Sequence, residues 1–430
     1  MIEKYYSGVI EQIYNRIGKE TRNIVMANYS NDFSIENLEV IRRYQSNEDN
    51  VFFAYSEFSY NTLVGAYEPF LDIICNMHRR FIGGSFDDFQ KECGVYYLHR
   101  QVLNSYYETG ECFREETVLL NEVAYEQRRM TMAIVDMLKR LSEVRPLMIV
   151  INRFQMASKS SIETIKYLID NPCTNIGIVL GVNVQVKGTD STVEVWDRIV
   201  ESLEDRSAIY YIGSAGQQKN HIRDTSDDEL YITTNFEQSI QEASNIMEFL
   251  DYEQAKRGCR IIEHKIKFED AWIDEKSLRR FYLIYARTSV LLGEMSKAIE
   301  LTNEYKALIP ESDSEHYFSI YYFMKGTCYM YQGKLEKAEG CAKKAYDYAL
   351  LADDELLEFK SELLSVMIKM SGWYNIFFCV QDIPVSDEFI EKIIKHGYRN
   401  HLAHIYIYAY DNSRDAVSYT HLTLPTKRIV

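Results

Sequence analysis

The chain has 430 residues, with 48 basic and 64 acidic side chains and a formal net charge of −16. This length suits two or three domains, and a hydrophobic content of 46% excludes wholesale disorder. The acidity disfavours sequence-independent DNA binding, which needs clustered Lys and Arg, so we expect no direct nucleic acid contact by residues 1–416.

The low proline content, six residues in the whole chain, favours helix over long irregular loops. No apolar run reaches the ~18 to 20 residues that span a bilayer, so we expect no membrane partner. The first twenty residues lack a basic segment followed by an apolar one, and the eight cysteines form no CxxC pair. These features predict a cytoplasmic protein with reduced thiols.

Five short apolar runs recur in the first half of the chain, between stretches of helical periodicity. Nearly continuous apolarity is typical of strands that are buried on both faces, as in a parallel sheet covered by helices. The pattern therefore predicts an α/β domain over residues 1–213. The predicted strands are Arg22–Ala27, Val51–Glu57, Pro146–Asn152, Asn175–Asn183 and Ser207–Gly213.

Helical stretches lie between these strands. They are predicted over Ile35–Tyr44, Glu115–Val144 and Ser160–Asp170. The last of these begins with Ser160 and has Glu163 three residues later, which is the pattern of a capping box. The glycine pair at Gly83 and Gly84 predicts a turn between helices.

A polar stretch, residues 214–233, predicts a linker, and helical patterns dominate residues 234–416. Within that region Tyr282–Pro310 and Tyr322–Leu350 align with each other. Gly293 and Gly333 are equivalent in this alignment, and so are Ala298 and Ala338. In each copy the glycine is expected to turn the corner between two helices, and the small alanine to let the second helix pack closely on the first.

Two weaker copies flank this pair. Ala255 stands before it at the position of Ala298, and Gly372 stands after it at the position of Gly333. Hairpins that stack in this way bury their apolar faces against neighbours and form a solenoid. The fold class predicted is therefore α/β followed by all-α.

The first half resembles a P-loop NTPase of the AAA/STAND kind. Strand RNIVMA, loop NYSNDFS and helix IENLEVIRRY stand in the place of a Walker A unit. Strand PLMIVIN, followed by RFQMASKSSIETIKYLI, resembles the Walker B strand of that family, and Asn183 stands where the next strand carries a polar sensor residue. The resemblance implies a nucleotide pocket at the ends of these strands.

The sequence departs from the family pattern at the positions that bind phosphate and Mg²⁺. A working P-loop reads G-x-x-x-x-G-K-[ST], whose backbone N–H groups and lysine hold the phosphates and whose hydroxyl holds Mg²⁺. In the matching stretch, Ala27 and Asp32 replace the glycines, Phe33 replaces the lysine, and Ser34 is retained. A shift of this alignment by one or two residues changes nothing, because the motif occurs nowhere in the chain.

At the Walker B strand the two acids are replaced by Asn152 and Arg153, so no carboxylate is left there to hold Mg²⁺ or orient water. Arg153 could contact a phosphate in place of the missing lysine, or form an ion pair at the strand end. The vestigial pocket comprises Ala27, Ser30, Asp32, Phe33, Ser34, Asn152, Arg153 and Asn183.

These losses predict a pseudo-NTPase with no catalytic residues and no cofactor. The alternative is a STAND-type switch that binds ATP in an altered pocket, and a third hypothesis is a scaffold that does not switch. His401 and His404 are spaced to share a helix face, but no Glu or Cys completes a site, so no metal site is predicted.

The second half resembles tetratricopeptide repeats, in the longer variant found in STAND-type transcription activators. That resemblance implies a protein or peptide ligand on the solenoid, and it is compatible with self-association. Tyrosines such as Tyr322 and Tyr348 either line a recognition groove or pack between repeats.

The end of the chain, Val417–Val430, reads VSYTHLTLPTKRIV and resembles translated sequencing-adapter read-through. We therefore expect a fragment whose output domain is missing. In LuxR-like relatives this domain is often a DNA-binding helix-turn-helix, and a nucleotide-cyclase or kinase domain is the alternative output.

Overall fold

A computed structural model describes residues 2–30, 38–46, 50–60, 63–114, 118–186, 193–212, 235–268, 273–375 and 386–412. The chain divides into two compact units. The first unit comprises Met1–Arg114 and Asn121–Trp272, and the second comprises Glu115–Leu120 and Ile273–Val430. Within the described ranges, no helix combines the length and the apolar character needed to cross a membrane.

The first unit is built on a five-stranded sheet in the order β2-β3-β4-β1-β5, in which every pair of neighbours is parallel. All five predicted strands are present. They are β1 (Ile24–Tyr29), β2 (Phe52–Glu57), β3 (Leu147–Asn152), β4 (Ile176–Asn183) and β5 (Ile209–Tyr211). Every residue of β3 and β4 is buried, whereas the edge strand β2 is half-buried, as expected for a sheet covered on both faces.

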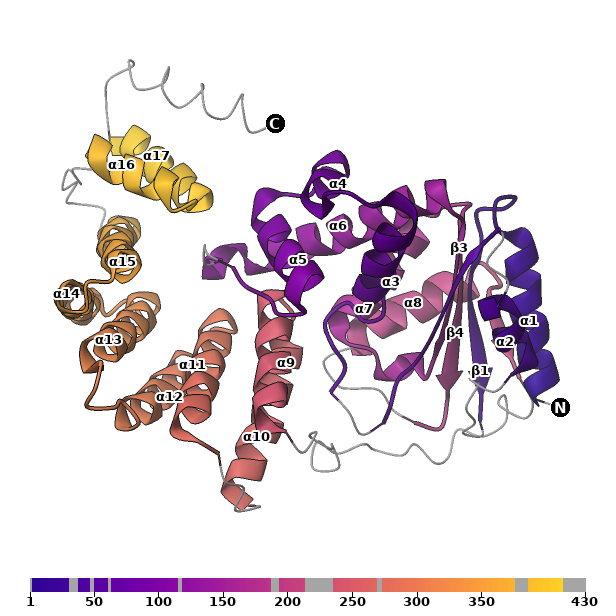
Figure 1. Ribbon diagram of the computed structural model, residues 1–430, viewed down its shortest axis with the longest axis horizontal. Helices are drawn as coiled ribbons and strands as arrows, with labels where there is room; N and C mark the ends of the chain where they lie inside the picture. The colour runs from indigo at the N-terminus through magenta and orange to yellow at the C-terminus, as the bar shows by residue number, and fades with distance from the viewer. Residues whose placement is uncertain are drawn as a thin grey trace. The chain divides into compact units, whose positions relative to one another are not determined.

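Helices cover both faces of this sheet, with α1 on one side and α7 and α8 on the other (Figure 1). The α-helices described in this unit are α1 (Ile2–Arg16), α2 (Glu39–Ser46), α3 (Phe70–Met77), α4 (Phe86–Glu92), α5 (Tyr97–Thr109), α6 (Val123–Val144), α7 (Lys159–Asp170), α8 (Val193–Glu204), α9 (Phe236–Glu248) and α10 (Tyr252–Phe268). The mixed α/β character predicted from the sequence is confirmed.

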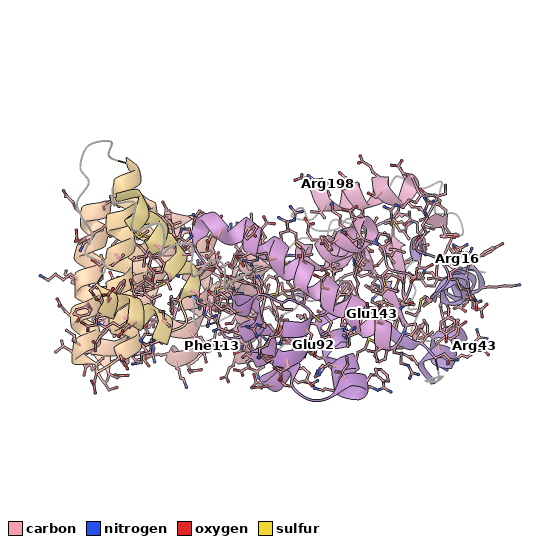
Figure 2. All side chains as sticks on the ribbon, turned by 90° about the horizontal axis from the view of Figure 1, so that it is seen from above. Arg16, Arg43, Glu92, Phe113, Glu143 and Arg198 are labelled. Atoms are coloured by element: carbon pink, nitrogen blue, oxygen red, sulfur yellow. The ribbon has the colours of Figure 1, made fainter. Side chains whose placement is uncertain are left out.

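Helix α1 lies close against β4 because two glycines of that strand leave room for it. A Cβ atom at Gly177 would lie 2.8 Å from the side chain of Ile17, and one at Gly181 would meet the hydroxyl of Tyr6. Helix α2 lies beside α1, and Arg43 of α2 pairs with Glu11 of α1. Figure 2 shows Arg43 and Arg16 of α1 at the same end of the unit.

The cap of α7 differs from the predicted capping box. Ser158, not Ser160, is the N-cap, and its hydroxyl accepts a hydrogen bond from the backbone N–H of Ser161. Ser160 instead joins distant segments: its hydroxyl accepts from the N–H of Tyr67 at 2.9 Å, and its own N–H donates to Asp251 at 3.0 Å. The tertiary partners of Ser160 therefore replace its predicted local role.

The predicted turn at Gly83 and Gly84 is present, and both glycines have positive φ.

The first unit extends beyond residue 213, the predicted end of the α/β domain, because α9 and α10 pack within it. Arg114 donates to the carbonyl oxygen of Glu248 at the end of α9, at 2.7 Å. Gln254 of α10 donates to the carbonyl oxygen of Val64 at 2.9 Å. The predicted linker, residues 214–233, lies outside the described residues.

The second unit is helical in its described residues. Its helices are α11 (Glu275–Leu291), α12 (Met295–Ala307), α13 (Ser314–Tyr331), α14 (Leu335–Leu351), α15 (Glu355–Asn375), α16 (Asp387–Lys395) and α17 (Arg399–Asn412). From α11 to α15 each helix packs against the next, and α16 packs against α17. Residues 413–430, which include the whole of the expected read-through segment Val417–Val430, lie outside the described residues.

The two aligned segments form helical pairs with the predicted local features. Gly293 and Gly333 lie between the helices of each pair with φ values of 78° and 71°, in the left-handed region that glycine favours. Ala298 and Ala338 are fully buried. The weaker copies differ: Gly372 lies inside α15 rather than at a turn, and Ala255 lies in α10 of the first unit.

Candidate functional site at the carboxyl edge of the sheet

The carboxyl ends of the five parallel strands meet at one edge of the sheet, here called the carboxyl edge. Neighbouring strands β1 and β4 lie at its centre, and the chain leaves them in opposite directions, from β1 toward β2 and from β4 toward β5. Ligands of open α/β sheets bind in the crevice outside such a switch point. Ser30 follows β1, Asn183 ends β4, and Asn152 ends β3, so the topology brings three predicted site residues to this edge.

A hydrogen bond between strand ends closes part of the edge. The hydroxyl of Tyr29, the last residue of β1, donates to Oδ1 of Asn152 at 2.7 Å. Both side chains are fully buried, and the bond passes over Gly181 of β4. The side chain of Asn152, predicted to replace a Walker B acid, is therefore uncharged and held by a tyrosine.

Tyr6 of α1 adds a second phenol to this cluster. Its ring is fully buried and meets the ring of Tyr29 edge-on, with centroids 6.5 Å apart. Burial raises the pKa of Tyr6, and the nearby Tyr55 and Glu57 raise it further, so this hydroxyl stays protonated at neutral pH.

Arg153 follows Asn152 and is held by the end of β2. Its Nη1 atom lies 3.1 Å from Oε1 of Glu57 and donates to the carbonyl oxygen of Phe58 at 3.3 Å. The guanidinium also stands 4.8 Å from the ring centroid of Tyr60. The ion pair at the strand end, one of the two roles predicted for Arg153, is thus present.

The backbone of Arg153 is in the left-handed region, at φ 55° and ψ 39°, which is unfavourable for a residue with a Cβ atom. The side-chain contacts to Glu57, Phe58 and Tyr60 fix this conformation at the end of β3. Glu57 also accepts a hydrogen bond from Tyr55, so its carboxylate has two partners within the protein.

Asn183, at the predicted sensor position, contacts the same tyrosine as Arg153. Its amide nitrogen donates to the Tyr60 hydroxyl at 3.2 Å, and its backbone N–H donates to Oε1 of Gln155 at 3.3 Å. Its Oδ1 accepts from the N–H of Gln185 at 3.0 Å. Asn183 therefore uses its polar groups to order the loops at the edge.

The other predicted pocket residues are placed as follows. Ala27 lies inside β1 and is fully buried, because the strand runs two residues past its predicted end and the loop begins only at Ser30. Ser30 is buried, with 1% of its surface exposed. Asp32, Phe33 and Ser34 lie outside the described residues.

Sequence reasoning missed five residues of this edge: Tyr6, Tyr29, Glu57, Tyr60 and Gln155. Glu57 had a readable signal, since it is a carboxylate at the last position of a predicted parallel strand. Tyr6 and Gln155 had none, because their contacts depend on how a helix and a short turn fold over the sheet.

Among the described residues of this edge, the charged groups Glu57 and Arg153 neutralise each other. In the portion of the chain that the structure describes, no three His, Cys, Asp or Glu side chains are grouped closely enough to hold a metal ion. The comparison of the sequence with protein-family models and with curated proteins gave no match. The family resemblance therefore rests on the layout of the motifs.

Proposed function

We propose that the chain is part of a regulatory protein in which a pseudo-NTPase unit is joined to a helical unit that recognises a protein or peptide. The observation that carries the first half of this proposal is that Asn152 and Arg153, which the resemblance aligns with the two Walker B acids, are both held by protein partners. Asn152 is bound by Tyr29, and Arg153 is bound by Glu57. Mg²⁺-assisted phosphoryl transfer needs free carboxylates at this position.

The second half of the proposal is supported by the aromatic surface of α13 and α14. Tyr322 and Tyr348 are half-buried, and their rings stack with centroids 5.7 Å apart and planes inclined by 9°. Lys344 lies over the ring of Tyr322 at 5.2 Å. Half-buried tyrosines with polar tips are enriched in protein interfaces, and helical-repeat proteins present such surfaces to extended partners.

The alternative is a switch that binds ATP in an altered pocket. A specific observation favours it: Arg153 is a cation at the carboxyl edge, and its side chain keeps 19% of its surface exposed. In this alternative the guanidinium leaves Glu57 and contacts a phosphate, which Arg favours as a bidentate partner.

Two assays distinguish the pseudo-NTPase proposal from the ATP-binding switch. They are calorimetric titration of the full chain with ATP and Mg²⁺, and an assay of phosphate release. The pseudo-NTPase proposal predicts no saturable heat and no turnover. The control variant is Arg198→Ala, because Arg198 is a surface residue of α8 that pairs with Glu194 of the same helix (Figure 2). Micromolar binding that Arg153→Ala abolishes and Arg198→Ala leaves intact would establish the switch instead.

A further inference from the structure

A cavity of about 420 Å³ lies inside the first unit, away from the residues of the carboxyl edge described above. Its walls come from the segment between Leu63 and Asp72, from Tyr106 of α5, and from helices α9 and α10. Pockets that enclose small molecules typically measure ~300 to 1,000 Å³, so the cavity has the size of a ligand site.

The walls are mostly apolar. Leu71 and Phe249 are buried side chains of the lining, and so are Ile261 and Ile262 of α10. Tyr106 meets Phe249 edge-to-face, with ring centroids 5.4 Å apart and planes inclined by 76°. Gly258 brings the backbone of α10 close, since a Cβ atom there would lie 2.7 Å from Leu63. These walls suit an apolar or aromatic body.

Three carboxyl groups, from Glu68, Asp72 and Glu242, interrupt this apolar lining. Glu68 accepts a hydrogen bond from the N–H of Gly65 at 2.9 Å, and Asp72 accepts one from the hydroxyl of Tyr106 at 3.1 Å. Glu242 accepts from the side chain of Gln238, on the same helix, at 3.0 Å. These donors are all neutral.

The lining contains no Lys, Arg or His, and no ion pair to these three carboxyl groups is found among the residues that the structure describes. Burial raises the pKa of both Glu68 and Glu242, and the negative charges of Asp72 and Glu242 add to the effect at Glu68. The site thus combines negative charge with partial burial and lacks a compensating cation, which disfavours a phosphate-bearing or other anionic ligand.

A metal ion does not fit this arrangement. The three carboxyl groups are not among any set of side chains, within the described ranges, that is grouped closely enough for metal binding. Ca²⁺ needs six to eight oxygen ligands at about 2.3–2.6 Å, and Mg²⁺ needs near-octahedral geometry. Carboxyl groups spread over an apolar cavity instead match a cation that carries its own apolar body.

We propose that this cavity binds an organic cation, a protonated amine or quaternary ammonium group attached to an apolar body. The cationic group lies against Glu68 and Glu242, the face of Tyr106 adds a cation–π contact, and the apolar body fills the space beside Phe249 and Ile262. This inference goes beyond the proposed function and does not depend on it, because the cavity does not include Asn152 or Arg153.

The test is calorimetric titration of the full chain with 4-phenylbutylamine and with its uncharged analogue 4-phenylbutan-1-ol. Saturable binding of the amine is expected, with the alcohol about tenfold weaker or worse, because only the amine pairs with the carboxylates. Glu242→Gln and Glu68→Gln should each weaken amine binding by about tenfold. Both changes conserve shape, and glutamine at position 68 can still accept the hydrogen bond of Gly65.

Glu237→Gln is the matched control, since Glu237 is an exposed residue of α9 outside the lining and its change should leave the affinity unaltered. Circular dichroism of each variant checks that the unit is folded. Equal affinities for amine and alcohol would overturn the proposal. So would an amine affinity that neither glutamine variant lowers, or a complete lack of saturable amine binding to the wild-type chain.

Discussion

The hydroxyl of Tyr29 donates a hydrogen bond to Oδ1 of Asn152 at 2.7 Å, although β4 separates their strands in the sheet. The bond passes over Gly181, which pairs in register with Ala27 of β1. A Cβ atom at Gly181 would lie 2.6 Å from Oδ1 of Asn152 and would also meet the hydroxyl of Tyr6. The ends of β1 and β3 are therefore joined only because β4 has a glycine between them.

Gly181→Ala should lower the free energy of unfolding of the first unit by about 1–3 kcal/mol, because buried side chains must move to admit the methyl group. The measurement is urea unfolding followed by circular dichroism and fitted with two transitions, one for each compact unit. Gly8→Ala is the control: Gly8 lies exposed in α1 with nothing within 4 Å of its added Cβ, so this change should stabilise the helix slightly. Similar effects of the two changes would contradict the close packing described at Gly181.

The strands of the first unit were predictable because their burial on both faces leaves nearly continuous apolar runs in the sequence. The residues at which the strands end were less predictable. Asn28 and Tyr29 belong to the polar stretch after the predicted strand Arg22–Ala27, yet they lie in β1 and pair with Val182 and Asn183 in the parallel ladder. Polar side chains indicate where the carboxyl edge lies in the sequence. The strand itself ends where its backbone pairing with the neighbouring strand ends.

Contacts between segments that lie far apart in the chain could not be predicted from the sequence. Periodicity carries information about neighbours within one element, so it predicted Ser160 as the cap of α7, whereas the cap is Ser158 and Ser160 binds Asp251. For the same reason the candidate site was predicted as a set of strand-end residues, while the partners that hold them, Tyr29 for Asn152 and Glu57 for Arg153, were not. The absence of an intact P-loop motif, by contrast, is a property of the sequence itself.

The second unit offers a matched pair of glycines inside helices. Gly326 of α13 is buried, and an added Cβ would lie 3.0 Å from Leu364 of α15 and 3.2 Å from Cys341 of α14. Gly340 of α14 is exposed, and an added Cβ would meet nothing within 4 Å. The first glycine therefore permits close packing of three helices, and the second does not.

Gly340→Ala should raise the free energy of unfolding of the second unit by about 0.5–1 kcal/mol, because alanine loses less backbone entropy in a helix. Gly326→Ala should leave the free energy of unfolding of the second unit unchanged or lower it, since the neighbouring side chains must shift. Urea unfolding of both variants, read from the transition of the second unit, makes the comparison. A stabilisation by Gly326→Ala as large as that by Gly340→Ala would show that the helices are less tightly packed than described.

His99 of α5 is fully buried beside a carboxylate of α6. Its Nε2 atom lies 3.0 Å from Oε2 of Glu126, whose other oxygen lies 3.1 Å from Nη1 of Arg129. Burial lowers the pKa of His99 to about 4, an effect that the nearby carboxylate of Glu126 offsets only in part and to which the charge of Arg114 adds. The imidazole is therefore neutral in the folded protein at neutral pH.

In the unfolded chain His99 should titrate near its ordinary pKa of ~6.5. Between about pH 6.5 and 4 the unfolded state thus binds a proton that the folded state does not, and the free energy of unfolding falls as the pH is lowered through this window. The loss attributable to His99 is roughly 3 kcal/mol at most and is complete below the folded pKa. Urea unfolding of the first unit at pH 7, 6 and 5 should show the decline.

His78, whose pKa burial also lowers, contributes in the same direction, so the comparison with His99→Gln isolates the part due to His99. Glutamine does not titrate, so this variant should lose markedly less stability than the wild type between pH 7 and pH 5. An unchanged slope in His99→Gln would mean that the buried imidazole is not the group that titrates. Burial raises the pKa values of Glu68, Glu242 and Asp251, and these groups act in the opposite direction as the pH falls, so the difference between the two profiles decides the prediction.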